Sequence, residues 1–366
     1  MRNARKTRRR GVRIGLGAGL ITMLVALAIA GCGGGDSSTS SGSSQGSGSS
    51  GTAENAANQS GSGGKLDVVG YSTPESVYTE SLEPAFERTP EGAGVSFSNS
   101  FGASGDQSRA VAAGQPAAVV HFSQAGDMER LVEEGEIVSK DWTDNRYEGI
   151  ASDSVVVMVV RKGNPEGLKS LDDLQSKDVE VVTPNPFSSG SARWNIMAVY
   201  GNALNQGKSP DEALSAVKTV LEKTVAQPGS ARDALATFTQ GEGDVLLSYE
   251  NEAIKAIEEG EDVEYVVPPS TIRIETPIAV TVDAPEPTAE DFLDFVWSDE
   301  GQEIWAENGY RPVNPKLVDP KQFPTPADLF TIADFGGWGK VNDEFFDDET
   351  GSVAKIEQEL GVSTSG

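Results

Sequence analysis

The sequence predicts an α/β fold with two lobes. Short apolar runs rich in β-branched residues alternate with helical patterns from about residue 65 to about residue 360, which is typical of parallel sheets covered by helices. The chain has 366 residues, too many for one compact core and enough for two lobes of roughly 100 to 200 residues each. Its hydrophobic content of 37% and charged content of 23% are ordinary for a soluble protein.

Each expected element follows from a local pattern. Strands are predicted where short β-branched runs occur, at 66–71, 94–97, 117–122, 154–161, 179–183, 244–247, 263–267 and 274–282. The run 154–161, SVVVMVVR, is the most apolar of them. Helical periodicity predicts helices at 75–86, from near 105, around 128–134, from near 192 to 204, at 210–223, after 249 and from 289.

Charge and residue counts exclude several classes of function. Lys and Arg total 29 against 56 Asp and Glu, so the net charge is −27. The chain therefore lacks the excess of basic residues that is typical of a nucleic-acid-binding protein. A single cysteine excludes an internal disulfide framework and a Cys-rich zinc site. A single histidine disfavours a Ser-His-Asp triad or a multi-His metal site.

The first 31 residues have the pattern of a secretory signal. Residues 2–13 carry seven basic side chains and no acid, and the uncharged apolar stretch 14–31 ends in Ile29-Ala30-Gly31 before Cys32. This end resembles the lipobox of bacterial lipoproteins, which implies a lipidated Cys32 at the mature N-terminus. The alternative is an uncleaved transmembrane anchor. Removal of 1–31 leaves 22 basic against 56 acidic residues, a net charge of −34.

Residues 32–64 are predicted to be the lipidated cysteine and a disordered tether. The stretch 33–64 contains 10 Gly and 11 Ser and no aromatic residue, so it cannot bury enough apolar surface to fold. A flexible coil of this length spans about 30 Å.

Four turns rich in Ser and Gly follow predicted strands and open predicted helices: 70–74 (GYSTP), 102–105 (GASG), 188–191 (SSGS) and 228–232 (PGSAR). The first N–H groups of a helix lack internal partners and lie at the positive end of its dipole, so each turn is a potential anion site. An ordinary helix cap has the same pattern. No turn has the Gly-Lys-Ser/Thr of a P-loop.

The segments VVRKGNP, TPNPFSSGSARWN and GDVLLSYENEA, followed by SDEGQEIWAENGYRP and LFTIADFGGWG, resemble the sulfate-binding proteins of bacterial ABC importers over roughly 66–345. The resemblance implies a two-lobed periplasmic-binding-protein fold of type II, with two crossover strands at a hinge that closes on the ligand. The implied lobes are 65–155 with 275–345, and 156–274, followed by a C-terminal helix and tail at about 340–366.

The resemblance also implies a site. In this family a dehydrated sulfate is held by backbone N–H groups at helix starts, by a Ser hydroxyl and by a Trp indole. Ser189 carries the hydroxyl position and Tyr249 the indole position. The backbone donors fall at Ser72, Ser104, Gly190, Ser191 and Ala231. Arg193 and Arg232 are expected to support the helix starts without facing the anion.

Four positions depart from the family pattern. Ser191 stands where the family usually has Gly, Ser72 where Asp is common, and Pro228-Gly229 where Asp-Ser is usual. Tyr249 replaces Trp, and a phenol can donate or accept a hydrogen bond whereas an indole only donates. A donor-only pocket suits sulfate and rejects the proton of hydrogen phosphate, so Tyr249 bears on selectivity and keeps thiosulfate open.

Two other classes of function fit the sequence less well. An enzyme would need a nucleophile and a base; Glu250, Glu252 and His121 are the candidates, but Glu250 and Glu252 are expected to point in different directions, and His121 reads as a core residue. A purely structural lipoprotein would need no cluster of helix starts. The sequence therefore predicts a monomeric, membrane-tethered, extracytoplasmic receptor that passes sulfate to an ABC permease, with no cofactor, metal or catalysis. Thiosulfate is the main alternative ligand, ahead of molybdate or phosphate.

Overall fold

The computed structural model describes residues 63–364. The chain divides into the units 1–55 and 56–366, and every described residue belongs to the second. The expected signal segment 1–31, Cys32 and nearly all of the tether lie outside the described residues. Within residues 63–364, no helix is both long and apolar enough to cross a membrane.

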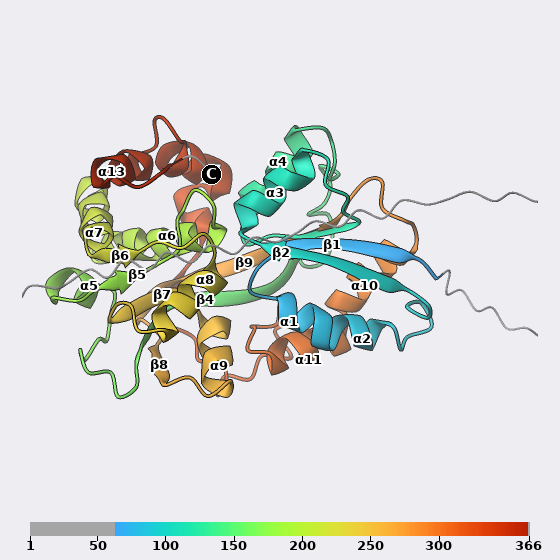
Figure 1. Cartoon of the computed structure of the whole chain (residues 1–366), viewed down its shortest axis with the longest axis horizontal. Helices are drawn as coiled ribbons and strands as arrows, with labels where there is room; N and C mark the ends of the chain where they lie inside the picture. Colours follow the sequence, from blue (N-terminus) through green and yellow to red (C-terminus); the bar gives the residue numbers. More distant parts are fainter. Residues whose placement is uncertain (1–62, 365–366) are drawn as a thin grey trace, which may run out of the picture. The chain divides into compact units, whose positions relative to one another are not determined.

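One sheet of ten strands organises the described unit, in the order β2-β1-β3-β9-β4-β7-β5-β6, with β10 paired to β9 and β8 paired to β4 (Figure 1). The bounds are β1 Lys65–Tyr71, β2 Ser96–Gly102, β3 Val119–His121, β4 Ile150–Arg161, β5 Val181–Val182, β6 Thr224–Ala226, β7 Val245–Tyr249, β8 Val263–Val266, β9 Ser270–Val280 and β10 Asp328–Phe330. We call β1, β2 and β3 the first strand group, and β5, β6 and β7 the second.

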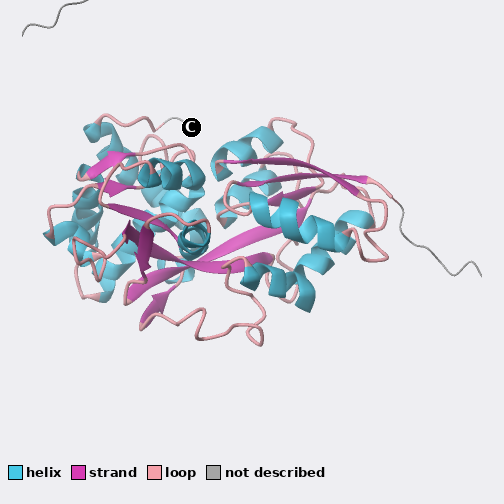
Figure 2. Ribbon diagram, turned by 60° about the horizontal axis from the view of Figure 1, so that its bottom comes forward, coloured by secondary structure: helices cyan, strands magenta, loops and turns pink. Residues whose placement is uncertain are grey.

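The two long strands β4 and β9 join the groups. Strand β4 pairs with β9 over 150–155 and with β7 over 156–160, while β9 pairs with β3 over 278–280. Figure 2 shows these long strands running between the two helix-covered parts of the sheet. The predicted parallel pairing is correct inside each group, where β1 pairs with β2 and β3, and β5 with β6 and β7. The parallel prediction is wrong at the centre of the sheet, where β9, which leads back to the first group, pairs antiparallel with β4.

Helices cover both faces of the first strand group. Figure 1 shows α3 and α4 on one face and α1, α2, α10 and α11 on the other. Their bounds are α1 Glu75–Val77, α2 Glu83–Phe86, α3 Ser104–Ala112, α4 Ala125–Glu133, α10 Thr288–Trp297 and α11 Asp299–Glu307, with a π-helical turn at Tyr78–Leu82 between α1 and α2. The helix predicted over 75–86 is therefore present, interrupted by this turn.

The second strand group is covered in the same way. Its helices are α5 Asp172–Ser176, α6 Gly190–Asn205, α7 Pro210–Glu222, α8 Ala231–Thr239 and α9 Glu250–Glu258. Strand β4 is apolar over 155–160 because its alternate residues pack in two different core clusters. Val156 and Met158 pack in the cluster of α6, whereas Val155 and Val157 pack with residues of α8 and α9.

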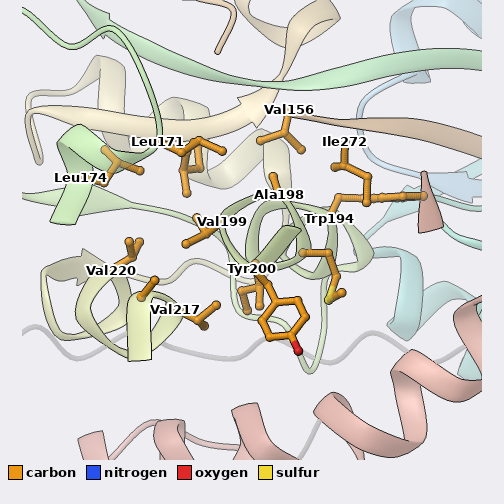
Figure 3. Packing of buried hydrophobic residues seen from close by; sticks show 14 of the residues in the cluster. Val156, Leu171, Leu174, Trp194, Ala198, Val199, Tyr200, Val217, Val220 and Ile272 are labelled. Carbon is orange, nitrogen blue, oxygen red and sulfur yellow. The ribbon is translucent and has the colours of Figure 1, made fainter. Parts of the chain in front are cut away.

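The C-terminal segment packs on the second strand group. It contains a 3₁₀ turn at Ile332–Phe335, α12 Gly337–Val341, a π turn at Asn342–Phe346 and α13 Ser352–Leu360. Trp338 stacks edge-on against Trp194 of α6, with ring centroids 4.6 Å apart. Figure 3 shows Trp194, Val199 and Tyr200 of α6 in this core. The first lobe was expected to run to residue 345, but Phe330 and Trp338 belong to the core of the second group.

Candidate functional site

Ser123, which follows β3, is the point where three helix starts meet. Its N–H donates to Ser104 Oγ of α3 at 2.9 Å, and its carbonyl accepts from Trp194 Nε1 of α6 at 2.6 Å. Its hydroxyl lies 2.9 Å from the hydroxyl of Tyr249, the residue that caps α9. Ser123 is 1% exposed. Contacts from both strand groups therefore converge on one small buried residue.

The start of α3 reaches across to the second strand group. Ser104 is the first residue of α3, and its hydroxyl donates to Asp127 Oδ2 at 2.7 Å. The N–H of Gly105 donates to the carbonyl of Ser188 at 3.0 Å. The side chain of Ser104 is thus committed to Asp127 and Ser123, whereas its backbone N–H belongs to the first turn of α3, where a helix provides no internal acceptor.

The turn before α6 has the predicted form. Strand β5 ends at Val182, Asn185-Pro186 follows, and Ser189 caps the helix with its N–H bonded to the carbonyl of Asn185 at 2.9 Å. The hydroxyls of Ser189 and Ser191 lie 3.0 Å apart. Gly190 packs so closely on Ser123 that a Cβ would lie 2.4 Å from Ser123 Oγ.

Arg193 joins this turn to the C-terminal segment. Its Nε donates to the carbonyl of Pro186 at 2.8 Å, and Nη1 donates to Asn342 Oδ1 at 2.8 Å. Its guanidinium also lies over the ring of Phe346, 5.0 Å from the centroid. Burial lowers the pKa of Arg193 to about 10, against the opposing charge of Asp127, so the group is cationic at neutral pH. These contacts hold Arg193 against the turn, and its supporting role at a ligand site stays a prediction.

The start of α8 lies beside the same turn. Ser188 Oγ donates to the carbonyl of Gly229 at 2.8 Å, which joins the turn before α8 to the turn before α6. Ala231 is the first residue of α8 and is buried. Arg232 Nη2 donates to the carbonyl of Thr73 at 2.7 Å and pairs with Glu252 at 3.2 Å. Arg232 therefore links the second strand group to the end of β1.

Ser72 completes the predicted set. It directly follows β1, is buried, and lies next to Thr73, whose carbonyl binds Arg232 and whose hydroxyl accepts from Tyr310 at 3.2 Å. The structure thus gathers Ser104, Gly190 and Tyr249 around Ser123. It places Ser189 and Ser191 in the same first turn of α6, and it connects Ala231 and Ser72 to that turn through their neighbours. Their role in ligand binding stays a prediction.

Sequence reasoning missed Ser123. The segment AVVHFSQAGD carries the same signal as the four recognised turns, an apolar strand followed by small polar residues and a helix. Gln124 caps α4 there by accepting from the N–H of Gly126 at 2.8 Å. A glutamine cap lacks the Ser/Gly composition of the other turns, so the pattern that identifies them does not identify this one.

The enzyme candidates lie in different surroundings. Glu250 pairs through both oxygens with Arg311, at 2.7 and 3.1 Å, whereas Glu252 faces Arg232, so the two carboxylates point apart as expected. Both are buried, which the sequence did not predict. His121 is buried, and its Nδ1 lies 2.9 Å from the hydroxyl of Tyr78. Residues 63–364 contain no group of three His, Cys, Asp or Glu side chains that could hold a metal ion.

Known proteins with this architecture match most of the chain. Residues 66–311 match the family described as bacterial extracellular solute-binding protein. The chain belongs to this family. A sulfate-binding protein of Synechococcus elongatus is 35% identical over 93% of this chain and 95% of its own length. A thiosulfate-binding protein of Pseudomonas aeruginosa is 35% identical over 76% of this chain and 88% of its own length.

A solved structure of this solute-binding family supports the fold. The sulfate-binding protein SubI of Mycobacterium tuberculosis is 43% identical, covers 77% of this chain and 99% of its own, and superposes with a TM-score of 0.74. The expected two-lobed periplasmic-binding-protein fold is thereby confirmed. In this solute-binding protein, Ser123 lies where the first strand group meets the second. Ligand sites occur preferentially at such boundaries.

Proposed function

We propose that this protein is an extracytoplasmic receptor that binds sulfate and delivers it to the permease of an ABC importer. The observation that carries the proposal is the meeting of the first turns of α3, α6 and α9 at Ser123, within one buried cluster. The similarity to sulfate-binding proteins over nearly the whole chain supports the same ligand.

Helix dipoles supply much of the charge that a sulfate dianion needs. Each helix start is equivalent to about +0.5 of an elementary charge, so three of them provide roughly +1.5 against −2. Hydroxyl donors at Ser189 and Tyr249 add charge-assisted hydrogen bonds. The arginines that surround the site are used elsewhere, since Arg193 binds Pro186 and Arg232 binds Thr73 and Glu252. The dianion would thus face dipoles rather than a cation.

Thiosulfate is the alternative ligand. It is also a dianion at neutral pH, and one close relative is named a thiosulfate-binding protein. Molybdate differs mainly in size. Phosphate brings a proton that needs an acceptor, and a pocket that leaves this proton unpaired rejects it by several kcal/mol. Sulfate is the better candidate because two of the similar proteins are named for it and because the backbone groups at the helix starts are donors.

The remaining parts of the proposal concern anchoring and movement. Cys32 would carry a lipid, and the segment up to residue 64 would tether the receptor, as a monomer, outside the membrane. Lobe 1 would comprise 65–155 and 275 to about 325, and lobe 2 would comprise 156–274 together with the C-terminal segment. Strands β4 and β9 would form the hinge. No reaction is carried out on the ligand, and no cofactor is needed.

Calorimetric titration of purified protein stripped of anion tests the ligand. We expect one-to-one binding of sulfate, weaker binding of thiosulfate and molybdate, and no heat from phosphate. Tighter binding of thiosulfate would move the proposal to the alternative ligand. Silence with all four anions would overturn the receptor function.

Substitution of Ser189 tests the site itself. Ser189→Ala removes a hydroxyl from the cap of α6, and we expect it to weaken sulfate binding by about 1–3 kcal/mol, the range for a hydrogen bond to a charged group. Ser188→Ala is the matched control, because the hydroxyl of Ser188 points to the carbonyl of Gly229. Equal affinities of the Ser189 variant and the unaltered protein would remove Ser189 from the site.

A further inference from the structure

The hydroxyl of Tyr249 has a partner on the other strand group. Tyr249 is fully buried at the start of α9, and Ser123, 126 positions earlier in the chain, is 1% exposed. Their oxygens lie 2.9 Å apart, and either one can be the donor. The two residues reach each other across the boundary between the first strand group and the second.

Every other polar group of Ser123 is already bonded. Its N–H donates to Ser104 Oγ, and its carbonyl accepts from Trp194 Nε1. Gly190 packs against the side chain of Ser123 so closely that a larger residue at position 190 would overlap the Ser123 hydroxyl. Ser123 is therefore held in place by α3 and α6, and its hydroxyl has Tyr249 as its partner among the described residues.

The direction of the hydrogen bond between the two hydroxyls decides which of their protons remains free. Each hydroxyl has one proton, and the hydrogen bond between them uses one of the two. If Tyr249 donates to Ser123, the phenol proton is used up internally. If Ser123 donates to Tyr249, the phenol proton is free to point at an anion, and the phenol oxygen already accepts a hydrogen bond. A nearby anion favours the second arrangement, in which the two bonds also strengthen each other.

We propose that Ser123 determines the anion specificity of this site by donating its proton to the phenol oxygen of Tyr249. The phenol then donates to the anion and has no free acceptor for an anion that carries a proton. A tyrosine in this arrangement acts as a donor-only group. Ser123 is a positioning residue, since it acts through Tyr249, and the inference rests on the proposed anion-binding function.

Two further observations fit this role. Burial raises the pKa of Tyr249 well above its usual value, so the phenol keeps the proton that it has to donate. The hydroxyl pair also forms only when the strand groups are close together. The same contact thus ties the orientation of the phenol proton to the arrangement in which the helix starts of α3 and α6 meet.

Calorimetry on Ser123→Ala tests the proposal, with sulfate, selenate and phosphate as probes. Sulfate and selenate carry no proton at pH 7, whereas hydrogen phosphate does. We expect sulfate and selenate affinities to fall about threefold to tenfold, as for the loss of one hydrogen bond. Phosphate, which is expected to give no heat with the unaltered protein, should give measurable heat, so that the phosphate-to-sulfate affinity ratio rises above its limit of detection. The double variant S123A/Y249W, in which an indole can only donate, should restore the low phosphate-to-sulfate ratio.

Ser152→Ala is the matched control. Ser152 is also fully buried and also pairs with a second hydroxyl, that of Thr276 at 3.1 Å, between β4 and β9. It should leave the phosphate-to-sulfate ratio unchanged. Tyr249→Phe is a second route to the same answer, and we expect it to weaken sulfate binding without any gain for phosphate.

The outcomes distinguish a failure of the proposed function from a failure of the role of Ser123. Absence of sulfate binding by the unaltered protein would overturn the proposed function. Normal sulfate binding together with an unchanged phosphate-to-sulfate ratio in Ser123→Ala would overturn the role of Ser123 alone. Unchanged sulfate affinity in Tyr249→Phe would do the same, since the phenol would then make no contact with the anion.

Discussion

The first turn of α9 borders two regions with opposite chemistry. On one side, Tyr249 joins Ser123 in a cluster built from hydroxyls and backbone groups. On the other side, Glu250 and Glu252 pair with Arg311 and Arg232. The two carboxylates are as buried as the two hydroxyls, so the difference between the regions does not come from exposure of these groups to solvent.

The comparison shows how the protein separates two tasks. Full charges are matched with one another at close range, which secures the frame, while neutral dipoles are left at the point where the strand groups meet. A buried cation beside the ligand would bind any anion strongly, whereas dipoles of fixed direction distinguish donors from acceptors. Stability is thus expected to depend on the charged region, and anion binding on the neutral one.

The largest expected effect is a loss of stability on removal of Arg311. Arg311→Met leaves Glu250 buried without its partner, and we expect the free energy of unfolding to fall by about 3–5 kcal/mol in chemical denaturation. Sulfate affinity of the folded variant should change little. Lys162→Met is the control, because the Lys162–Asp262 pair is exposed and worth about 0–1 kcal/mol. A large loss of affinity with little loss of stability would reverse the comparison.

A smaller effect is expected from extra volume in the neutral region. Gly190→Ala puts a Cβ 2.4 Å from Ser123 Oγ, which forces α6 and Ser123 apart and should cost about 1–3 kcal/mol of sulfate binding by calorimetry. Gly229→Ala is the matched control, since the nearest atom to its Cβ is Ser188 Oγ at 4.0 Å. Equal affinities of the two variants would show that the contact between Gly190 and Ser123 is unimportant for binding.

At neutral pH the smallest effect is expected from the single histidine, His121, which lies two residues before Ser123. Burial lowers its pKa from 6.5 to about 3. Between these values the unfolded chain binds a proton that the folded chain does not, so the stability that His121 contributes is present above pH 6.5 and is lost as the pH falls toward 3. Between about pH 3 and 6.5, His121→Gln should reduce the slope of unfolding free energy against pH by about 1.4 kcal/mol per pH unit. The same slope in both proteins would contradict the lowered pKa.

Much of the fold could be predicted because burial leaves a pattern in the sequence. Strand β4 packs against helices on both faces, and its run of apolar residues therefore identifies it as a buried strand. Strand β6, Thr224–Ala226, is three residues long and only partly buried, so it has no such run. Strand β2 begins at Ser96 rather than 94 because Gly94 adopts a positive φ of 80° in the preceding turn.

The site could be predicted only where its chemistry is local. The turns at Ser189 and Ser104 are recognisable because the capping residue and the helix are adjacent in the chain. The burial of Glu250 depends on Arg311, 61 positions away, and the contact of Tyr249 depends on Ser123, 126 positions away. Such partners are brought together by the pairing of β4 and β9, which joins the two strand groups, and no short segment contains the information.

The bond between Trp194 and Ser123 gives the protein an optical signal of its own. The Trp194 indole is fully buried and donates to the carbonyl of Ser123, a residue of the opposite strand group. Its stacking partner Trp338 lies on its own side. Any separation of the strand groups would remove the acceptor and admit water to one edge of the indole while the Trp338 contact persists. The chain contains five tryptophans, and the contribution of Trp194 to their fluorescence would change as the strand groups open and close.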